Sequence, residues 1–416
     1  MAYCLRFDEC RQSFVQGVCV NKGLVALASG AFAFGFAEFV MMGILPTVAV
    51  GVGVSVPAAG NFISAYAIGV CFGTLILVFG HSVAPKRLLL LFMVLAFVGN
   101  AGAALAPNAQ LLTVARFVSG MPHGAFFGTA TIVAKELAQK GREGQAVAIM
   151  VLGQTLANTI GVPGGTLLAS LVSWRAAFVF VAAWSVLSFL LIARLVPQVP
   201  STPDAGLAGQ FRFLGKPGPW MVLGAVLLGN TGLFCWWSYV SPWLTSIGGF
   251  AEAALPALLV LGGAGMIVGS QVGGRVADAT SSARSAAMGQ ALSCVTLLLI
   301  WAVSGTHVTA ALLMFVCCVA LFFPSSGQQI LMVECGQGGG EMIGSACVQV
   351  AFNGGNAIGA LVGQHVLDAG MAYNWPALAG VPFAALSVAL LVWFALRWER
   401  GYHEAATKAK AAAQAE

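Results

Sequence analysis

Twelve apolar stretches, each of about 20 residues or more, fill most of this 416-residue chain, and charged side chains are almost absent from them. A helix of that length crosses the roughly 30 Å hydrocarbon core of a bilayer. Of 19 basic and 14 acidic residues, only Arg116 and Glu38 lie well inside the stretches. The pattern predicts an all-α membrane protein with twelve transmembrane helices. The predicted spans are residues 24–50, 58–80, 88–106, 109–134, 144–171 and 174–196, then 219–246, 252–273, 285–304, 307–333, 342–367 and 374–397.

The basic residues fall almost entirely on one side of these spans. All 19 except Arg116 and Arg175 lie in the terminal segments or in loops that share a side. Lys and Arg are retained on the cytoplasmic side of membrane proteins. We therefore expect a multi-pass protein of the bacterial inner (plasma) membrane with both termini in the cytoplasm. The net charge of +5 requires no nucleic-acid partner.

A proline-rich stretch after the sixth span divides the chain into two halves. We expect a cytoplasmic N-terminal extension (1–22), a six-helix bundle (23–196), a cytoplasmic linker (197–218), a second six-helix bundle (219–400) and a cytoplasmic tail (401–416). Matching features recur between the halves at an offset of about 196–198 residues, which indicates an internal repeat. The matches are Pro46 with Pro242, Gly69 and Gly73 with Gly265 and Gly269, and Asn158–Gly161 with Asn356–Gly359.

The ten cysteines predict neither a disulfide framework nor a metal centre. They lie in the predicted spans or toward the cytoplasm, so no pair in an outer loop is available to be bridged. No Cys/His cluster has metal-ligand spacing, and the spans contain no HExxH, GxSxG or paired acids. We expect no cofactor, no metal and no enzymatic activity.

Four motifs carry a resemblance to a known family. They are Gly35–Pro46 (GFAEFVMMGILP), Arg116–Gly128 (RFVSGMPHGAFFG), Gly161–Gly165 (GVPGG) followed by Trp174-Arg175, and Ala351–Gly359 (AFNGGNAIG). Together they resemble the major facilitator superfamily, and within it the AraJ-like, sugar-efflux branch of the twelve-span drug:proton antiporters. The resemblance covers nearly the whole chain and implies the major facilitator fold of two pseudo-symmetric six-helix bundles. It also implies a monomer in the lipid bilayer that binds a small-molecule substrate and protons.

The loop motif of that superfamily is incomplete in the first half of the chain. Gly80-His81-Ser82 leads to Lys86-Arg87 without the acid that the motif carries. The second copy, with Gly274, Asp278 and Arg284, retains the acid. The resemblance implies that Asp278 caps a helix and latches the two halves together.

Glu38, Arg116 and His123 are the candidates for proton coupling. A charged group inside a membrane is costly unless it is neutralised or paired, so such residues are by default functional. Arg116 keeps its charge and can hold a carboxylate, and His123 lies on the same helix face and could relay a proton. The alternatives are a structural acid bonded to a neighbouring helix for Glu38 and a neutral, hydrogen-bonded histidine for His123. Helices 1 and 4 adjoin in the resembled fold, so we expect Glu38 and Arg116 to interact.

Span 5 carries a proline among glycines. The gating candidates are Gly161, Pro163, Gly164 and Gly165. Proline lacks an N–H group and clashes with the preceding turn, so we expect a break in the helix. In antiporters of the resembled family this motif closes the cavity against leak, and the resemblance assigns it that role here. We expect Asn158 and Asn356 to form hydrogen bonds between helices rather than to bind substrate.

Spans 7 and 10 offer aromatic rings and amides for a substrate cavity, which the resembled fold forms from spans 1, 4, 7 and 10. Such groups suit either a sugar stacked on a ring or a flat hydrophobic drug. The candidates are Asn230, Trp236, Trp237, Tyr239, Phe322, Phe323, Gln328 and Gln329. An interfacial aromatic belt is the alternative for Trp236, Trp237 and Tyr239.

The sequence as a whole predicts a proton-coupled secondary transporter. It would export a small molecule, either a sugar or a lipophilic drug-like compound, by alternating access. Export rests on the antiporter-type motif in span 5. The alternatives are an uncoupled or uptake permease and a non-transporting membrane sensor on the same scaffold.

Overall fold

A computed structural model describes residues 21–74, 76, 83–139, 143–199, 211–336 and 341–405, and these residues form helices without any strand. The first half contains α1 (Lys22–Val52), α2 (Val56–Gly73), α4 (Pro85–Leu105), α5 (Ala109–Glu136), α6 (Glu143–Leu156), the π turn η1 (Ala157–Gly161), α7 (Val162–Leu171) and α8 (Trp174–Leu195). The second half contains η2 (Arg212–Gly215), α10 (Pro217–Trp237), α11 (Val240–Ser246), η3 (Glu252–Ala254), α12 (Leu255–Ala279), α13 (Ser282–Val303), α14 (His307–Phe322), α15 (Ser325–Cys335), α16 (Glu341–Asp368) and α17 (Trp375–Arg397). The helix after α17 continues to residue 405, so the first residues of the predicted tail are helical.

Ten helical stretches of the described chain are long and apolar enough to cross a membrane. α5 and α16, each of 28 residues, are as long but carry more polar residues, among them Arg116 and Asn356. These two helices bring the long helical segments of the described chain to the twelve that the sequence predicts. The two bundles of the fold therefore correspond to the two halves of the chain.

Three of the spans depart from a regular α-helix near prolines. In span 5 the helix does not end at Pro163: α6 passes through η1 into α7, because a wide π turn can absorb the missing N–H group. Span 7 turns at Ser238 and Tyr239 before Pro242, and span 10 turns before Pro324. The break that the sequence predicted at Pro163 is therefore wrong, because the helix continues through it, and the sequence did not predict the interruptions in spans 7 and 10.

The membrane-crossing direction of the helices defines two sides of the molecule. We call the side where α8 ends and α10 begins the linker side, and the opposite side the far side. α1 begins and α17 ends on the linker side: Gly23 packs against Leu195, and Gly218 packs against Tyr402. Among the described basic residues, Arg175 is the one whose side chain lies on the far side, where it donates to the carbonyl oxygen of Ala106.

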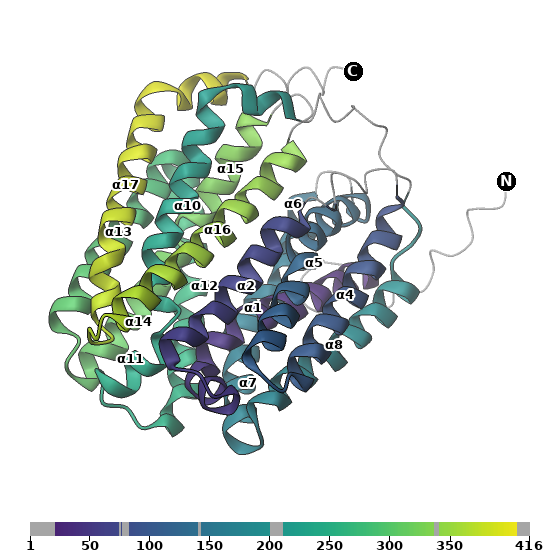
Figure 1. Cartoon of the computed structure of the whole chain (residues 1–416). Helices are drawn as coiled ribbons and strands as arrows, with labels where there is room; N and C mark the ends of the chain where they lie inside the picture. The colour runs from purple at the N-terminus through teal and green to yellow at the C-terminus, as the bar shows by residue number, and fades with distance from the viewer. Residues whose placement is uncertain are drawn as a thin grey trace, which may run out of the picture.

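The two halves share one apolar core on the far side and have separate cores on the linker side. The largest buried cluster combines α1 residues between Phe36 and Ala49 with second-half residues between Leu233 and Leu244. A second cluster contains residues of the first half alone, and a third contains residues of the second half alone. Figure 1 shows the bundles converging near α7 and α11 and diverging on the linker side. The halves are therefore held together on the far side and apart on the linker side.

Glycine pairs that match between the halves occupy equivalent contacts. Added Cβ atoms on Gly69 and Gly73 would collide with the backbone of α5, and Cβ atoms on Gly265 and Gly269 would meet the backbone of α14. α2 therefore packs on α5 as α12 packs on α14, backbone against backbone. The internal repeat predicted from the sequence thus corresponds to a repeated helix contact.

Candidate transport site

Glu38 lies in the middle of α1, and its side chain is almost completely buried (2% exposed). Its Oε1 accepts a long hydrogen bond of 3.5 Å from Nδ2 of Asn356 in α16. Its Oε2 lies 3.9 Å from Nε2 of His123 in α5. Asn356 belongs to the second half and His123 to the first, so the carboxyl group lies where the two halves meet.

Arg116 is fully buried beside Glu38 but forms no ion pair with it among the described side chains. Its Nη1 donates to the carbonyl oxygen of Ala37 at 2.8 Å, and its Nε donates to that of Phe62 at 3.3 Å. The guanidinium carbon lies 4.4 Å from the centre of the Tyr66 ring, within reach of a cation–π interaction. Arg116 therefore ties α1 to α2 through backbone oxygens, and it acts on Glu38 through charge attraction rather than direct contact.

Tyr66 in α2 links the histidine to the backbone of α1. Its hydroxyl oxygen lies 2.8 Å from Nδ1 of His123 and 3.3 Å from the carbonyl oxygen of Phe34. If the hydroxyl donates to Nδ1, then Nε2 carries the hydrogen and faces the carboxylate of Glu38. If the hydroxyl donates to Phe34 and accepts from Nδ1, then Nε2 can face a protonated carboxyl group. The tautomer of His123 can thus follow the protonation state of Glu38.

We refer to Glu38, Tyr66, Arg116, His123 and Asn356 as the Glu38 cluster. Sequence reasoning named Glu38, Arg116 and His123 as proton-coupling candidates. It also predicted that Asn356 forms a hydrogen bond between helices, and the structure confirms that bond. It missed Tyr66. The glycine stripe of span 4 indicated a close helix contact, and a Cβ on Gly120 would collide with the backbone of Tyr66, but the stripe alone does not identify the residue on the other helix.

A model of the Major Facilitator Superfamily matches residues 27–337 of the chain. The chain belongs to the major facilitator superfamily. It is 40% identical over 375 residues to the protein named "Putative transporter AraJ" of Escherichia coli (strain K12), and the match covers 89% of this chain and 95% of that protein. It is 34% identical over 381 residues to the inner membrane transport protein YdhP of the same strain, covering 91% and 97%. These relatives support an AraJ-like member of the superfamily.

Solved structures support the same fold. A bacterial homologue of the human lysosomal transporter Spinster, solved in an inward-facing and unoccupied conformation, superposes with a TM-score of 0.67 at 16% sequence identity. The match covers 94% of this chain and 98% of that one. The protein is therefore a multi-pass membrane transporter with the major facilitator fold, and its curated relatives are named as transporters rather than as enzymes.

Of the gating candidates, Gly161 and Gly165 lie at contacts with α1, whereas nothing lies within 4 Å of a Cβ added to Gly164. A Cβ on Gly161 or Gly165 would collide with the ring of Phe36 in α1. The adjoining π turn faces the second half, where a Cβ on Gly263 of α12 would lie only 2.5 Å from Cα of Thr159. The motif is thus part of the packing between the halves, and its role in preventing leak stays a prediction.

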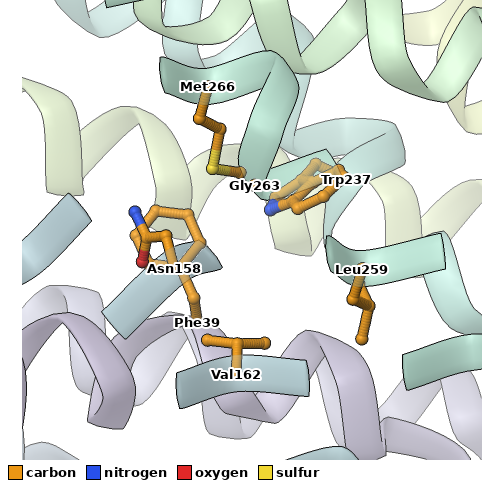
Figure 2. Close-up of a pocket in the computed structure, with 7 residues that line it drawn as sticks. All are labelled: Phe39, Asn158, Val162, Trp237, Leu259, Gly263 and Met266. Atoms are coloured by element: carbon orange, nitrogen blue, oxygen red, sulfur yellow. The ribbon is translucent and has the colours of Figure 1, made fainter. Parts of the chain in front are cut away.

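Asn158 does not form the hydrogen bond that the sequence predicted. Among the described residues its buried Oδ1 has no hydrogen-bond partner, and the indole N–H of Trp237 across the contact has none either. Figure 2 shows both side chains beside a small pocket between the halves, with Phe39 and Met266. The pocket has a volume of about 10 Å³, which is close to the minimum for one water molecule.

Two of the substrate candidates are fixed in the protein core. Trp236 packs against Trp237 and Trp243, with ring centres 5.9 and 4.9 Å apart. The hydroxyl of Tyr239 donates to the carbonyl oxygen of Ala360 at 2.9 Å and lies 3.2 Å from that of Pro57 in the first half. Because both side chains are fully buried in the protein, they do not form an interfacial aromatic belt.

The other substrate candidates differ in how their polar groups are satisfied. Asn230 donates from Nδ2 to the carbonyl oxygen of Val226 in its own helix. Gln328 is buried (3% exposed), and its Nε2 has no hydrogen-bond partner in the part of the chain that the structure describes. Phe322 packs at the edge of the shared core. Gln328 therefore has a buried donor available for a substrate, although contact of any of these residues with substrate stays a prediction.

The structure does not show the contacts that the resemblance implies for Asp278 of the loop motif. Asp278 is exposed and makes no hydrogen bond or ion pair in the described chain. The start of α13 is capped by Glu399 instead, which accepts from the backbone nitrogen of Ala283 at 2.8 Å and from the hydroxyl of Ser281 at 3.1 Å. Ser281 in turn accepts from the backbone nitrogen of Arg284. In the described chain Asp278 thus makes neither contact, and its role as a cap and latch stays a prediction.

In the same motif, Gly274 lies on α12, where an added Cβ would meet only the hydroxyl oxygen of Ser326 at 3.7 Å, so this glycine does not enforce a tight contact. The first copy of the motif, Gly80-His81-Ser82, lies outside the described residues.

Proposed function

We propose that the protein is a proton-coupled exporter of a small molecule that works by alternating access. The observation that supports this proposal is the contact between the halves at a buried acid: Asn356 of the second half donates to the carboxyl group of Glu38 in the first half. A carboxylate is costly to hold away from water unless a proton or a cation neutralises it. Movement of the halves that changes the exposure of Glu38 would therefore change its affinity for a proton.

The mechanism follows from where the cluster lies. In this conformation the linker-side ends of the halves lie apart, and Glu38 still keeps its contact with Asn356. When the halves separate on the far side, α16 retreats from α1, and the carboxyl group of Glu38 loses Asn356 and meets water, where its proton exchanges. When the halves close, the neutral form is buried at lower cost than the charged form. Arg116 stays bound to the backbone of α1 and α2 throughout, because both of its acceptors belong to the first half.

The direction and orientation of transport are also part of this proposal. Export is supported by the resemblance of Gly161–Gly165 to the antiporter motif. Placement of both termini in the cytoplasm is supported by the basic residues of the linker side. The linker side is then cytoplasmic and the far side faces outward. The substrate is a sugar or a lipophilic drug-like compound, the cavity includes Phe322 and Gln328, and the working unit is a monomer.

The test is substrate-elicited proton movement in proteoliposomes with a panel of sugars and lipophilic drugs. Wild-type protein should move protons when its substrate is added, and Glu38→Gln should not, because glutamine has nearly the same shape but cannot release a proton. Glu404→Gln is the matched control, since Glu404 is an exposed acid beside Arg400 on the linker side.

Three results would count against the proposal. Proton movement at the wild-type level in Glu38→Gln would remove Glu38 from the coupling mechanism. Substrate flux that a protonophore leaves unchanged would indicate an uncoupled permease. Absence of any response across the panel, in folded protein, would favour a sensor.

A further inference from the structure

A cavity of about 220 Å³ opens between the halves on the far side of the molecule. Residues of α1, α2, α7, α11, η3 and α12 line it, together with Tyr373 from the connection between α16 and α17. We call it the far-side vestibule. Its volume corresponds to roughly seven water molecules at about 30 Å³ each, which is below the range of about 300–1,000 Å³ for drug-sized sites. The vestibule therefore suits a compound with a single ring.

The polar lining of the vestibule presents mainly hydrogen-bond acceptors. Six hydroxyls line the vestibule, and those of Thr47, Ser246 and Tyr373 make no hydrogen bond in the described chain, so they can donate or accept. The other three give their only proton to carbonyl oxygens of their own helices: Thr166 to Val162 at 3.0 Å, Ser170 to Leu167 at 2.8 Å, and Thr245 to Pro242 at 3.2 Å. Each of these oxygens keeps lone pairs for a ligand but has no proton to offer it. The lining therefore favours a ligand that donates hydrogen bonds.

Glu252 is the one formally charged residue in the lining. It is exposed, and in the described chain it has neither an ion-pair partner nor a hydrogen bond. No lysine, arginine or histidine lines the vestibule. Partial burial raises the pKa of the Tyr373 phenol, so this group stays neutral and adds no second negative charge. The lining thus has one unpaired negative charge and an excess of acceptors.

We propose that the far-side vestibule binds small, positively charged compounds that are rich in hydrogen-bond donors, such as amino sugars or hydroxylated amines. The ammonium group would face Glu252, and the hydroxyl or amine hydrogens would face Thr166, Ser170 and Thr245. If the protein is an exporter, this is the last site that such a compound occupies before release. That role rests on the proposed function, whereas binding in the vestibule does not.

The test compares three probes of nearly equal size, glucosamine, glucose and glucuronate, which differ in charge. Binding to the full chain in lipid nanodiscs is measured by calorimetry at neutral pH without a proton gradient. Glucosamine should bind best and glucuronate worst. Glu252→Gln should weaken glucosamine binding about three- to tenfold, because a partly exposed charge contact is modest, and should leave glucose binding nearly unchanged. Thr166→Val, which keeps the shape but removes an acceptor, should weaken both glucosamine and glucose.

The control is Asp368→Asn, because Asp368 at the end of α16 is an exposed far-side acid that does not line the vestibule. It should leave glucosamine binding unchanged. An equal loss in Asp368→Asn and Glu252→Gln would indicate general surface attraction and overturn the site. Equal binding of the three probes, or no binding at millimolar concentration, would overturn it too. Glu38→Gln should still bind glucosamine, so failure of proton coupling and failure of the vestibule are distinguishable.

Discussion

Replacing Gly263 by alanine is expected to push the two halves apart at one point of their far-side contact. The added Cβ would lie 2.5 Å from Cα of Thr159 and 3.0 Å from the carbonyl oxygen of Asn158. Both are backbone atoms, so no side-chain rotation relieves the collision. Reaching an ordinary contact of 3.4 Å requires a helix shift of about 1 Å. Overpacking of this kind costs about 1–3 kcal/mol. Because the contact exists only while the far side is closed, the ratio of closed to open conformations should fall about 5- to 150-fold.

The assay is a distance measurement between spin labels on the linker side, for example at Lys135 in α5 and Arg275 in α12, which are exposed and lie in different halves. Labels attached through unnatural amino acids avoid the ten native cysteines. If the far side opens, the linker-side distance should shorten in Gly263→Ala. Gly102→Ala in α4 is the control, because its added Cβ would meet only the Cβ of Ala115, at an ordinary distance of 3.4 Å. A distance distribution in Gly263→Ala that matches both wild type and the control would refute the reasoning.

Two other substitutions test the Glu38 cluster and the helix cap. Arg116→Lys should lower the rate of substrate flux about tenfold or more at equal expression, because one ammonium group cannot serve the carbonyl oxygens of both Ala37 and Phe62; a wild-type rate in proteoliposomes would contradict this. Glu399→Ala should lower the free energy of unfolding by about 1–2 kcal/mol, because α13 loses a charged cap at its N-terminus. Unfolding in mixed micelles, with Glu404→Ala as the control, measures this change in the free energy of unfolding. Equal stability of the two variants would contradict the capping role.

The sequence could predict the parts of this molecule that depend on the cost of charge in a membrane. Glu38 and Arg116 stood out because ionisable groups are rare in apolar spans, and both lie in the same buried cluster. The glycine stripes predicted close helix contacts, and Gly69, Gly73 and Gly120 are at such contacts. These inferences use only local sequence and a large energetic penalty, so they did not require knowledge of the tertiary arrangement.

The substrate candidates show where sequence reasoning fails. A helix inside a membrane protein is apolar on the face toward lipid and on the face toward other helices, so periodicity does not reveal which face lines a cavity. Trp236 therefore looked available for a substrate, but it is fully buried against Trp243. Tyr66 was missed for a related reason, because a tyrosine in an apolar span carries no penalty large enough to mark it.

The far-side contact between the halves must be weak enough to open during transport. Its polar part depends on hydroxyls: Ser241 donates to the carbonyl oxygens of Met42 and Gly43, at 2.7 and 3.1 Å, and Tyr239 lies 3.2 Å from the carbonyl oxygen of Pro57. A hydroxyl has one proton to share, so each of these side chains contributes a net stabilisation of about 1 kcal/mol. No ion pair joins the halves there among the described residues. Binding of a proton or a substrate can supply free energy of this size. The buried apolar contact, in which Gly263 lets the helices approach closely, is then the larger barrier to opening. For this reason the Gly263→Ala substitution should shift the conformations more than loss of either hydroxyl.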